Sequence, residues 1–209
     1  MRPPLPSPLK IRADAARNRA RILEAAAEVF AERGLEASTA EVARRAGVGE
    51  ATLYRRFPSR DDLVLAIVQT QMDEVAAAAE ECLRDLDPWR GLERFMHEMI
   101  ARRVSDVGAL DAVKAHCMAS PELGAHRRRV LDATSALVRR GQEAGVVRED
   151  LTGTDLSFLL TAAASVGGLP FPGLREDVWK RYLGVILDGM RPEGATKLRP
   201  AAPSRRVFG

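Results

Sequence analysis

Apolar residues recur along most of this chain at the three- and four-residue spacing of amphipathic helices. One stripe consists of Ile22, Leu23, Ala26, Val29 and Phe30. Because these positions share one face of a helix, they predict a helix that ends where Gly34 supplies a C-terminal cap. No stretch alternates apolar and polar residues with the period of two that a strand requires. The pattern therefore predicts an all-α protein of about nine helices.

Three helical segments are expected in residues 17–57, and two of them are very short. Ser38 and Glu41 have the spacing of a capping box and begin a second helix. Gly47 ends that helix at Ala46. A third helix is expected from about Glu50 to Phe57, because the proline that follows disfavours the helical conformation of the residue before it.

The remaining helices are predicted from the same signals. Ser59, followed by Asp61 and Asp62 at the positive end of the dipole, begins a long helix from Arg60 to about Arg84. Later caps and stripes predict a helix that begins at Asp87-Pro88-Trp89, one carrying Leu110, Val113 and Cys117, one from Ser120-Pro121 to Gly145, and two more at about 154–166 and 175–190.

Charge divides the chain into a basic beginning and an acidic body. Residues 1–60 hold 12 Lys and Arg against 7 Asp and Glu, whereas residues 61–190 hold 15 against 21. This asymmetry favours contact of the first part with a polyanion. We expect a disordered basic arm in 1–15, a basic nucleic-acid-binding domain in 16–60, a separate helical body in 61–190 and a disordered basic tail in 191–209.

Several classes of protein are excluded by composition. Hydrophobic residues make up 46% of the chain and charged residues 29%, as in ordinary globular domains. No apolar run approaches the roughly 18 residues that a transmembrane helix needs, and the Pro-rich start lacks the apolar region of a signal peptide. Cys82 and Cys117 have no metal or disulfide spacing. These features predict a cytoplasmic protein with no membrane partner, no metal and no cofactor.

The second and third segments, joined by Gly47-Val48-Gly49, have the arrangement of a helix-turn-helix. A major groove admits one helix, which needs a second helix to brace it. Leu53 and Phe57 are expected to anchor the recognition helix inward. Glu50, Ala51, Tyr54 and Arg55 are then expected to face outward.

The stretch from Ser38 to Phe57, STAEVARRAGVGEATLYRRF, resembles the DNA-binding signature of TetR-type (TetR/AcrR) transcriptional regulators. Its most specific part is Thr52-Leu53-Tyr54 followed by Phe57. The resemblance extends over about residues 17–65, and it implies an N-terminal helix-turn-helix domain followed by a helical ligand-binding and dimerisation domain. Gly49 stands where the family often has Ser, and Ala51 where Gly is common.

The resemblance implies roles for the matched positions. It implies that Ser38 and Thr39 cap the second helix and contact phosphate. The Tyr54 hydroxyl would contact a phosphate as well. Thr52 contacts the backbone or a thymine methyl group, and Arg60 clamps a phosphate where the family usually has Lys. By the same resemblance, Glu50, Ala51 and Arg55 contact the edges of the bases.

The residues themselves leave alternatives open for this segment. Arg44, Arg45 and Arg56 either contact DNA or form a solvated face, and Tyr54 is either a phosphate contact or a packing residue. Glu50 either accepts a hydrogen bond from a base or repels wrong sites. The basic residues of the arm either enter a minor groove or belong to a plain tail; they are Arg2, Lys10 and Arg12.

The body is expected to hold an effector pocket and a dimer interface. Its candidate pocket residues, which suit a small apolar or amphipathic effector, are Met96, Met99, Ile100, Leu110, Val113, Cys117, Leu137 and Phe158. The candidate interface with a second copy consists of Ala162, Ser165, Trp179, Leu183, Ile186 and Leu187. In each set, packing within one chain is the alternative.

The leading hypothesis is a homodimeric, ligand-responsive repressor that binds palindromic double-stranded DNA. An activator, or a helical interaction protein without a small-molecule effector, is the alternative. His97, His116 and His126 have no metal-ligand spacing, and the chain contains no nucleophile-elbow, P-loop or zinc-protease motif, so an enzyme is not expected.

Overall fold

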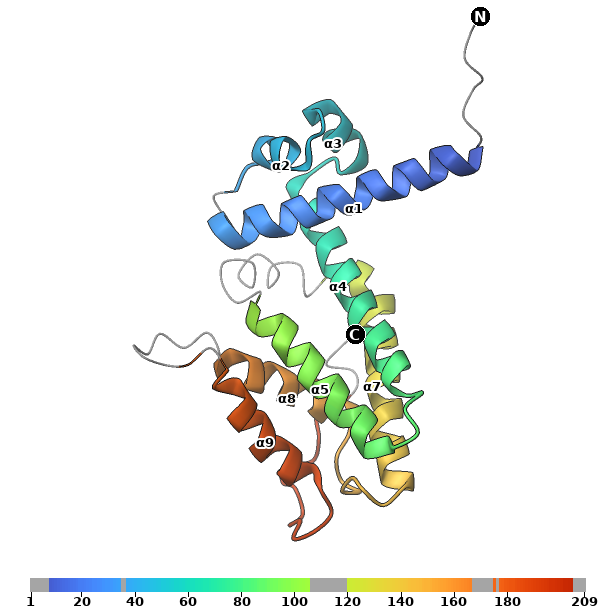
Figure 1. Ribbon diagram of the computed structural model, residues 1–209, viewed down its shortest axis with the longest axis vertical. Coiled ribbons are helices and arrows are strands. Elements are labelled where there is room, and N and C mark those ends of the chain that lie inside the picture. Colours follow the sequence, from blue (N-terminus) through green and yellow to red (C-terminus); the bar gives the residue numbers. More distant parts are fainter. Residues whose placement is uncertain (1–7, 35–36, 106–119, 167–174, 176, 205–209) are drawn as a thin grey trace, which may run out of the picture. The chain divides into compact units, whose positions relative to one another are not determined.

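The computed structural model describes residues 8–34, 37–105, 120–166, 175 and 177–204. Every regular element in these ranges is a helix, so the all-α prediction is confirmed for them (Figure 1). The elements are α1 (Pro8–Arg33), α2 (Thr39–Ala46), α3 (Glu50–Arg56), α4 (Arg60–Cys82), α5 (Pro88–Ser105), the 3-10 helix η2 (Pro121–Leu123), α7 (Gly124–Glu143), α8 (Gly153–Ser165) and α9 (Trp179–Met190). The stripe expected at Leu110, Val113 and Cys117 lies outside the described residues.

The chain folds as two compact units that divide inside α4, after Val68. We call the described residues up to 68 the first unit and those from 69 onward the second unit. The sequence placed this division between residues 60 and 61, where α4 begins. Because α4 is one uninterrupted helix of 23 residues, no break in the hydrophobic pattern marks the change of unit.

The predicted helix starts have the expected caps. The backbone N–H of Glu41 donates to Ser38 Oγ at 3.2 Å at the start of α2. At the start of α4, Ser59 N–H donates to the Asp62 carboxylate at 2.9 Å and Asp62 N–H donates back to Ser59 Oγ at 3.1 Å. Asp87 Oδ1 accepts from Trp89 N–H at 2.9 Å at the start of α5. These caps satisfy amide groups that have no partner within the helix.

The core of the first unit lies between α1, α2, α3 and the beginning of α4. The stripe predicted for α1 is buried along its whole length. The α2 helix packs on α1, and α3 packs on α2. The other buried side chains of this core include Val42, Ala43, Ala46, Leu53, Phe57, Leu63 and Ile67.

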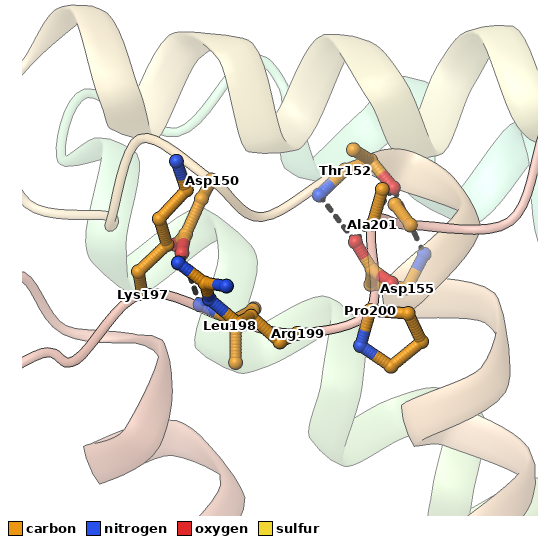
Figure 2. Close-up of a pocket in the computed structure, with 9 residues that line it drawn as sticks. Asp150, Thr152, Asp155, Lys197, Leu198, Arg199, Pro200 and Ala201 are labelled. Atoms are coloured by element: carbon orange, nitrogen blue, oxygen red, sulfur yellow. Dashed lines mark hydrogen bonds between the residues drawn. The ribbon is translucent and has the colours of Figure 1, made fainter.

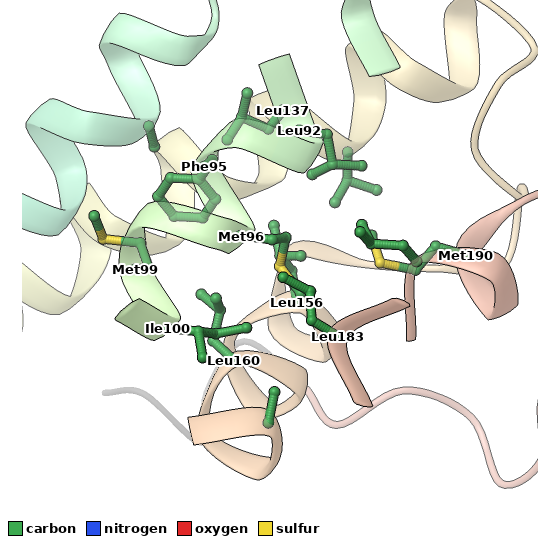
Figure 3. Packing of buried hydrophobic residues seen from close by; sticks show 14 of the residues in the cluster. Leu92, Phe95, Met96, Met99, Ile100, Leu137, Leu156, Leu160, Leu183 and Met190 are labelled. Atoms are coloured by element: carbon green, nitrogen blue, oxygen red, sulfur yellow. The ribbon is translucent and has the colours of Figure 1, made fainter. Parts of the chain in front are cut away.

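The second unit is organised around α5, which contacts α7, α8 and α9. Figure 3 shows the buried side chains that these helices share. They include Leu92, Phe95, Met96, Met99, Ile100, Leu137, Leu156, Leu160, Leu183 and Met190. Full burial of each such side chain contributes about 1.5–3 kcal/mol to the stability of the unit.

The ends of the chain differ from the expectation of two disordered segments. Helix α1 already begins at Pro8, so part of the expected arm is helical. Residues 8–15 include two alanines, Ala13 and Ala15, and no interior proline, which favours continuation of the helix toward the N-terminus.

At the other end, the backbone at Thr196 and Leu198 is bonded to Arg148 and Asp150 of the same unit. The Arg148 guanidinium donates to the carbonyl oxygens of Gly189, at 3.1 Å, and Thr196. Leu198 N–H donates to Asp150 Oδ2 at 2.8 Å (Figure 2). The ion pair with Arg148, together with the Leu198 amide, lowers the pKa of Asp150 to about 2. Composition alone could not reveal these contacts, because their acceptors are mostly backbone carbonyls.

Candidate nucleic-acid interface

The turn between α2 and α3 is fixed by Gly47 and by its hydrogen bonds. Gly47 has φ 63°, and its N–H donates to the carbonyl oxygens of Ala43 and Arg44. Val48 N–H also donates to Ala43 O, at 3.0 Å. A side chain at residue 47 would suffer strain from the left-handed conformation, and its Cβ would lie 3.0 Å from Arg21 Nη2. The turn therefore sets the direction in which α3 leaves α2.

Helix α3 is anchored on one side only. Leu53 is fully buried and Phe57 is 5% exposed, as the sequence predicted. On the opposite side Glu50, Ala51 and Arg55 are exposed, while Thr52 is half-buried. The helix thus presents a short row of polar and small side chains to solvent from a rigid support.

The Tyr54 side chain belongs to the exposed row. It is 46% exposed, and its hydroxyl lies 2.7 Å from Thr39 Oγ1 at the first turn of α2. Tyr54 is therefore not a core residue, and its contact with a phosphate stays a prediction. The two hydroxyl groups join the recognition helix to its brace at the outer surface.

Arg45 does not point away from the protein. Its guanidinium forms a two-point ion pair with Glu32 on α1, at 2.9 and 2.8 Å, and contacts Glu28 at 3.2 Å. The hydrogen bonds with Glu32 raise the pKa of Arg45, and the same pair lowers the pKa of Glu32. Because Glu28 and Glu32 are four residues apart on one face of α1, they form a ready acceptor for this fork-shaped cation. Arg45 is thus paired within its own unit, and its contact with DNA stays a prediction.

Arg60 likewise turns inward, although the resemblance implies a phosphate clamp. Its Nη2 donates to the carbonyl oxygen of Gly34 at 3.1 Å, and its guanidinium carbon lies 5.2 Å from the centre of the Phe30 ring. Gly34 follows the last turn of α1, where carbonyl groups lack helical partners and the helix dipole favours a cation. Arg60 therefore closes the end of α1 in this structure.

Sequence reasoning missed Arg21, whose Nη2 donates to the carbonyl oxygen of Ala46 at 2.6 Å. This bond closes the end of α2 directly before the turn. The only signal for it in the sequence is a basic residue beside the apolar stripe of α1, which many solvated helices also show. Arg33 and Arg44 both pair with Glu41, at 3.0 and 3.5 Å.

Five basic side chains of the first unit, which we also call the head, divide into two groups. Arg21, Arg45 and Arg60 brace the three-helix scaffold. Arg55 and Arg56 are exposed, and within the described ranges neither is paired with a carboxylate. Arg55 and Arg56, at the end of α3, are thus available to a polyanion.

The candidate pocket residues do not gather around one described cavity. Met96, Met99, Ile100 and Leu137 are packed in the core cluster of the second unit. Phe158 on α8 is instead 46% exposed. Leu110, Val113 and Cys117 lie outside the described residues, so the pocket itself stays a prediction.

The residues expected at the dimer interface are divided between the core and the surface. Trp179, Leu183 and Leu187 are buried within their own unit, because they face α5 and α8. Ala162 and Ser165 are exposed, and Ile186 is half-buried.

Three large exposed apolar side chains on α8 and α9 were not singled out for the interface. They are Phe158, Tyr182 (47% exposed) and Val185 (65% exposed). Tyr182 and Val185 have helical spacing, but so do the buried residues of α9, and periodicity alone does not say which stripe faces the core.

Each histidine that the structure describes contacts a side chain from another helix or a distant part of the sequence. His97 makes an edge-to-face contact with Trp179 at 4.9 Å between ring centres, and His126 Nδ1 lies 2.9 Å from Asp73 Oδ1. His116 falls outside the described residues. In the part of the chain that can be inspected, no three His, Cys, Asp or Glu side chains are arranged to hold a metal ion. A search of the same residues found no helix with the length and hydropathy needed to cross a membrane.

Two family models match the chain over most of its length. Residues 22–67 match the bacterial regulatory proteins of the tetR family, and residues 87–192 match the C-terminal domain of SbtR-like transcriptional regulators. The first match contains α2 and α3, and the second contains the described helices from α5 onward.

Individual relatives agree with these matches. The chain is 30% identical over 135 residues to the HTH-type transcriptional regulator NfxB of Pseudomonas aeruginosa, covering 63% of this chain and 71% of that protein. It is 40% identical over 67 residues to the HTH-type transcriptional activator FasR of Mycolicibacterium smegmatis, but that match spans only 32% of this chain and 31% of FasR.

Solved structures resemble the chain over nearly their whole length. A TetR transcriptional regulator from Streptomyces coelicolor, SCO0520, superposes with a TM-score of 0.66 at 32% identity, covering 83% of this chain and 98% of that one. A TetR regulatory protein from Mycobacterium vanbaalenii gives a TM-score of 0.65 at 33% identity, covering 87% and 99%.

Proposed function

Because this chain belongs to the TetR family of DNA-binding transcriptional regulators, we propose that it is a homodimeric repressor that binds a palindromic operator and is released by a small-molecule effector. The observation that carries the proposal is the outward face of α3. Its exposed side chains suit the edges of base pairs, and the buried Leu53 and Phe57 hold that face rigidly outward. Contact with the chromosome places the protein in the cytoplasm.

We assign base contacts to Glu50, Ala51 and Arg55. An arginine can donate two hydrogen bonds to guanine, and a glutamate can accept one from cytosine. Thr52 is placed to contact the backbone or a thymine methyl group. Phosphate contacts fall to Ser38, Thr39, Tyr54 and Arg56, whose exposed or half-buried positions support them.

Arg45 and Arg60 receive a different role from the one that the resemblance implies. Their carboxylate and carbonyl partners lie within the head. We assign both to the rigidity of the three-helix scaffold, and this assignment leaves the phosphate contacts mainly to hydroxyl groups and to Arg56.

A single head touches few base pairs, so specificity needs a second copy. Two recognition helices about 34–36 Å apart reach successive major grooves on one side of a palindrome. We propose that the second copy packs on the exposed parts of α8 and α9. Small side chains at Ala162 and Ser165 permit close approach, and Phe158, Tyr182 and Val185 supply apolar area.

The effector is proposed to be a small apolar or amphipathic molecule bound by the second unit. It releases DNA only if it binds more tightly to a state in which the two heads no longer match the operator. The name of FasR is that of an activator, so activation by the same head is the second candidate. The sign of regulation is measured by transcription in vitro from a promoter that carries the operator.

The proposal is tested by selecting bound sequences from a random duplex library with the purified full chain. We expect a palindromic consensus, binding that weakens steeply with salt, and two chains per duplex in light scattering. Absence of any salt-sensitive binding to duplex DNA would contradict the proposal. A consensus without two-fold symmetry would contradict the homodimer alone.

A further inference from the structure

The contact between Thr39 and Tyr54 joins two helices at the surface expected to meet DNA. Their hydroxyl oxygens lie 2.7 Å apart, although the residues are 15 positions apart in the chain. Both residues are held in place by their neighbours in the chain. Thr39 follows the capping residue Ser38, and Tyr54 follows the fully buried Leu53.

The chemistry of two bonded hydroxyl groups is directional. Each group has one proton to donate, and the bond between them uses one of the two protons. The other proton is left to a third partner. A phenol is a stronger acid than an aliphatic alcohol, so with an anion nearby the favoured order is Thr39 donating to the Tyr54 oxygen and Tyr54 donating outward. Successive hydrogen bonds of this kind polarise and strengthen one another.

We propose that Thr39 is a positioning residue for Tyr54, and that the two hydroxyls bind a single DNA phosphate oxygen as one unit. Tyr54 makes the contact with the phosphate. Thr39 fixes the phenol ring on the outer surface and orients its proton. The inference rests on the proposed function, and it adds a coupling between two side chains that separate phosphate contacts would not have.

The ion pairs of the neighbouring arginines support this order of donation, from Thr39 to Tyr54 to the phosphate. The two cations of α2 nearest to Thr39 along the chain are engaged, because Arg44 pairs with Glu41 and Arg45 pairs with Glu32. At the start of α2 a phosphate therefore meets the neutral hydroxyl groups, while Arg55 and Arg56, which follow Tyr54 on α3, are left to a base pair and to another phosphate. Because a neutral donor displaces no counterion, loss of this contact lowers affinity without changing its salt dependence.

The test is a double-mutant cycle in the full chain with Thr39→Val, Tyr54→Phe and the pair. Affinity is measured by fluorescence anisotropy on one duplex at several salt concentrations. We expect each single variant to bind roughly tenfold more weakly, since each loses a hydrogen bond that serves a charged group. The double variant should bind no more than about twofold more weakly than the weaker single variant. The slope of affinity against salt should be the same in all four proteins.

Thr39→Ser is the matched control, because it keeps the hydroxyl and should bind within about twofold of the parent. A second readout replaces single operator phosphates with neutral methylphosphonates. At the phosphate that the pair binds, the penalties of both substitutions should vanish together. Thermal unfolding of each variant confirms that the head is intact.

Multiplied losses, near a hundredfold in the double variant, would show two independent contacts and overturn the inference. So would full affinity in Thr39→Val beside a weakened Tyr54→Phe. If the parent chain binds no duplex at low salt, the proposed function itself fails, and that result is distinct from both of these.

Discussion

Helices α3 and α9 each bury one face in their own unit, but the faces that they leave exposed differ in kind. On α3, Leu53 is buried and Glu50, Tyr54 and Arg55 are exposed. On α9, the buried side chains are Trp179, Leu183 and Leu187, and the exposed apolar ones are Tyr182 and Val185. The first outward face can donate and accept hydrogen bonds at several points, whereas the second carries two large apolar side chains among the charged Lys180, Arg181 and Asp188.

This difference indicates two kinds of partner for one chain. A face of polar groups on a rigid support suits the edges and phosphates of a duplex, where water must be replaced by equivalent hydrogen bonds. Large apolar side chains gathered on one exposed surface suit contact with another protein surface. The predictions below test whether each face has the partner assigned to it.

The largest effects are expected on the buried sides. Leu53→Ala and Leu183→Ala should each lower the free energy of unfolding by about 2–5 kcal/mol, because each opens a cavity in a packed core. Urea denaturation measures both. If Leu183→Ala left the stability of the subunit unchanged and weakened only self-association, Leu183 would face the partner, and the assignment of the two faces of α9 would be reversed.

The exposed face of α9 is tested next with Val185→Asp. A charge on each side of a two-fold interface should weaken dimerisation by at least about 2 kcal/mol, or roughly thirtyfold. Sedimentation velocity at several concentrations measures the change. Leu86→Asp is the control, because Leu86 is 97% exposed and lies outside α8 and α9. A dimer as strong as the parent would remove Val185 from the interface.

A somewhat smaller effect is expected on the exposed face of α3. Arg55→Ala should relax the preference for one base pair by about 1–3 kcal/mol, since one side chain contributes that much discrimination. Selection from a random library compares the preferences position by position. Arg45→Ala is the contrast, because Arg45 pairs with Glu32 and should leave the base preferences unaltered. A preference that changes with Arg45 and not with Arg55 would exchange their roles.

The smallest expected effect concerns the start of α3. Gly49 has extended backbone angles and makes no side-chain cap, and no atom lies within 4 Å of a Cβ built there. Gly49→Ser should therefore stabilise the head by a few tenths of a kcal/mol, or about 0.3. Differential scanning calorimetry of the two proteins side by side gives the shift. A loss of stability would mean that the turn needs the freedom of glycine.

Local signals predicted the helices well, because each depends on a few neighbouring residues. Ser38, Ser59 and Asp87 cap the helices that they were expected to begin. Leu53 and Phe57 are buried as their spacing indicated. The outward face of α3 followed directly from these two anchors.

The sequence could not show where the arginines point. Arg45 and Arg60 are held by Glu32 and by the carbonyl oxygen of Gly34, more than ten residues away in each case. The same limit applies to α9. Apolar residues occur on several of its sides, so the choice between core and partner depends on which helices pack against it, and spacing within α9 carries no information about them.

The bonds that hold residues 196 and 198 have a consequence for synthesis of the protein. The ribosome synthesises Arg148 and Asp150 before Thr196 and Leu198. Until those two residues emerge, the Arg148 guanidinium and the Asp150 carboxylate remain hydrated at the positions that Thr196 O and Leu198 N–H later occupy. These last two bonds can therefore form only after residue 198 has left the ribosome. A nascent chain arrested shortly after α9 would hold the whole hydrophobic cluster of the second unit but lack the bonds to Thr196 and Leu198.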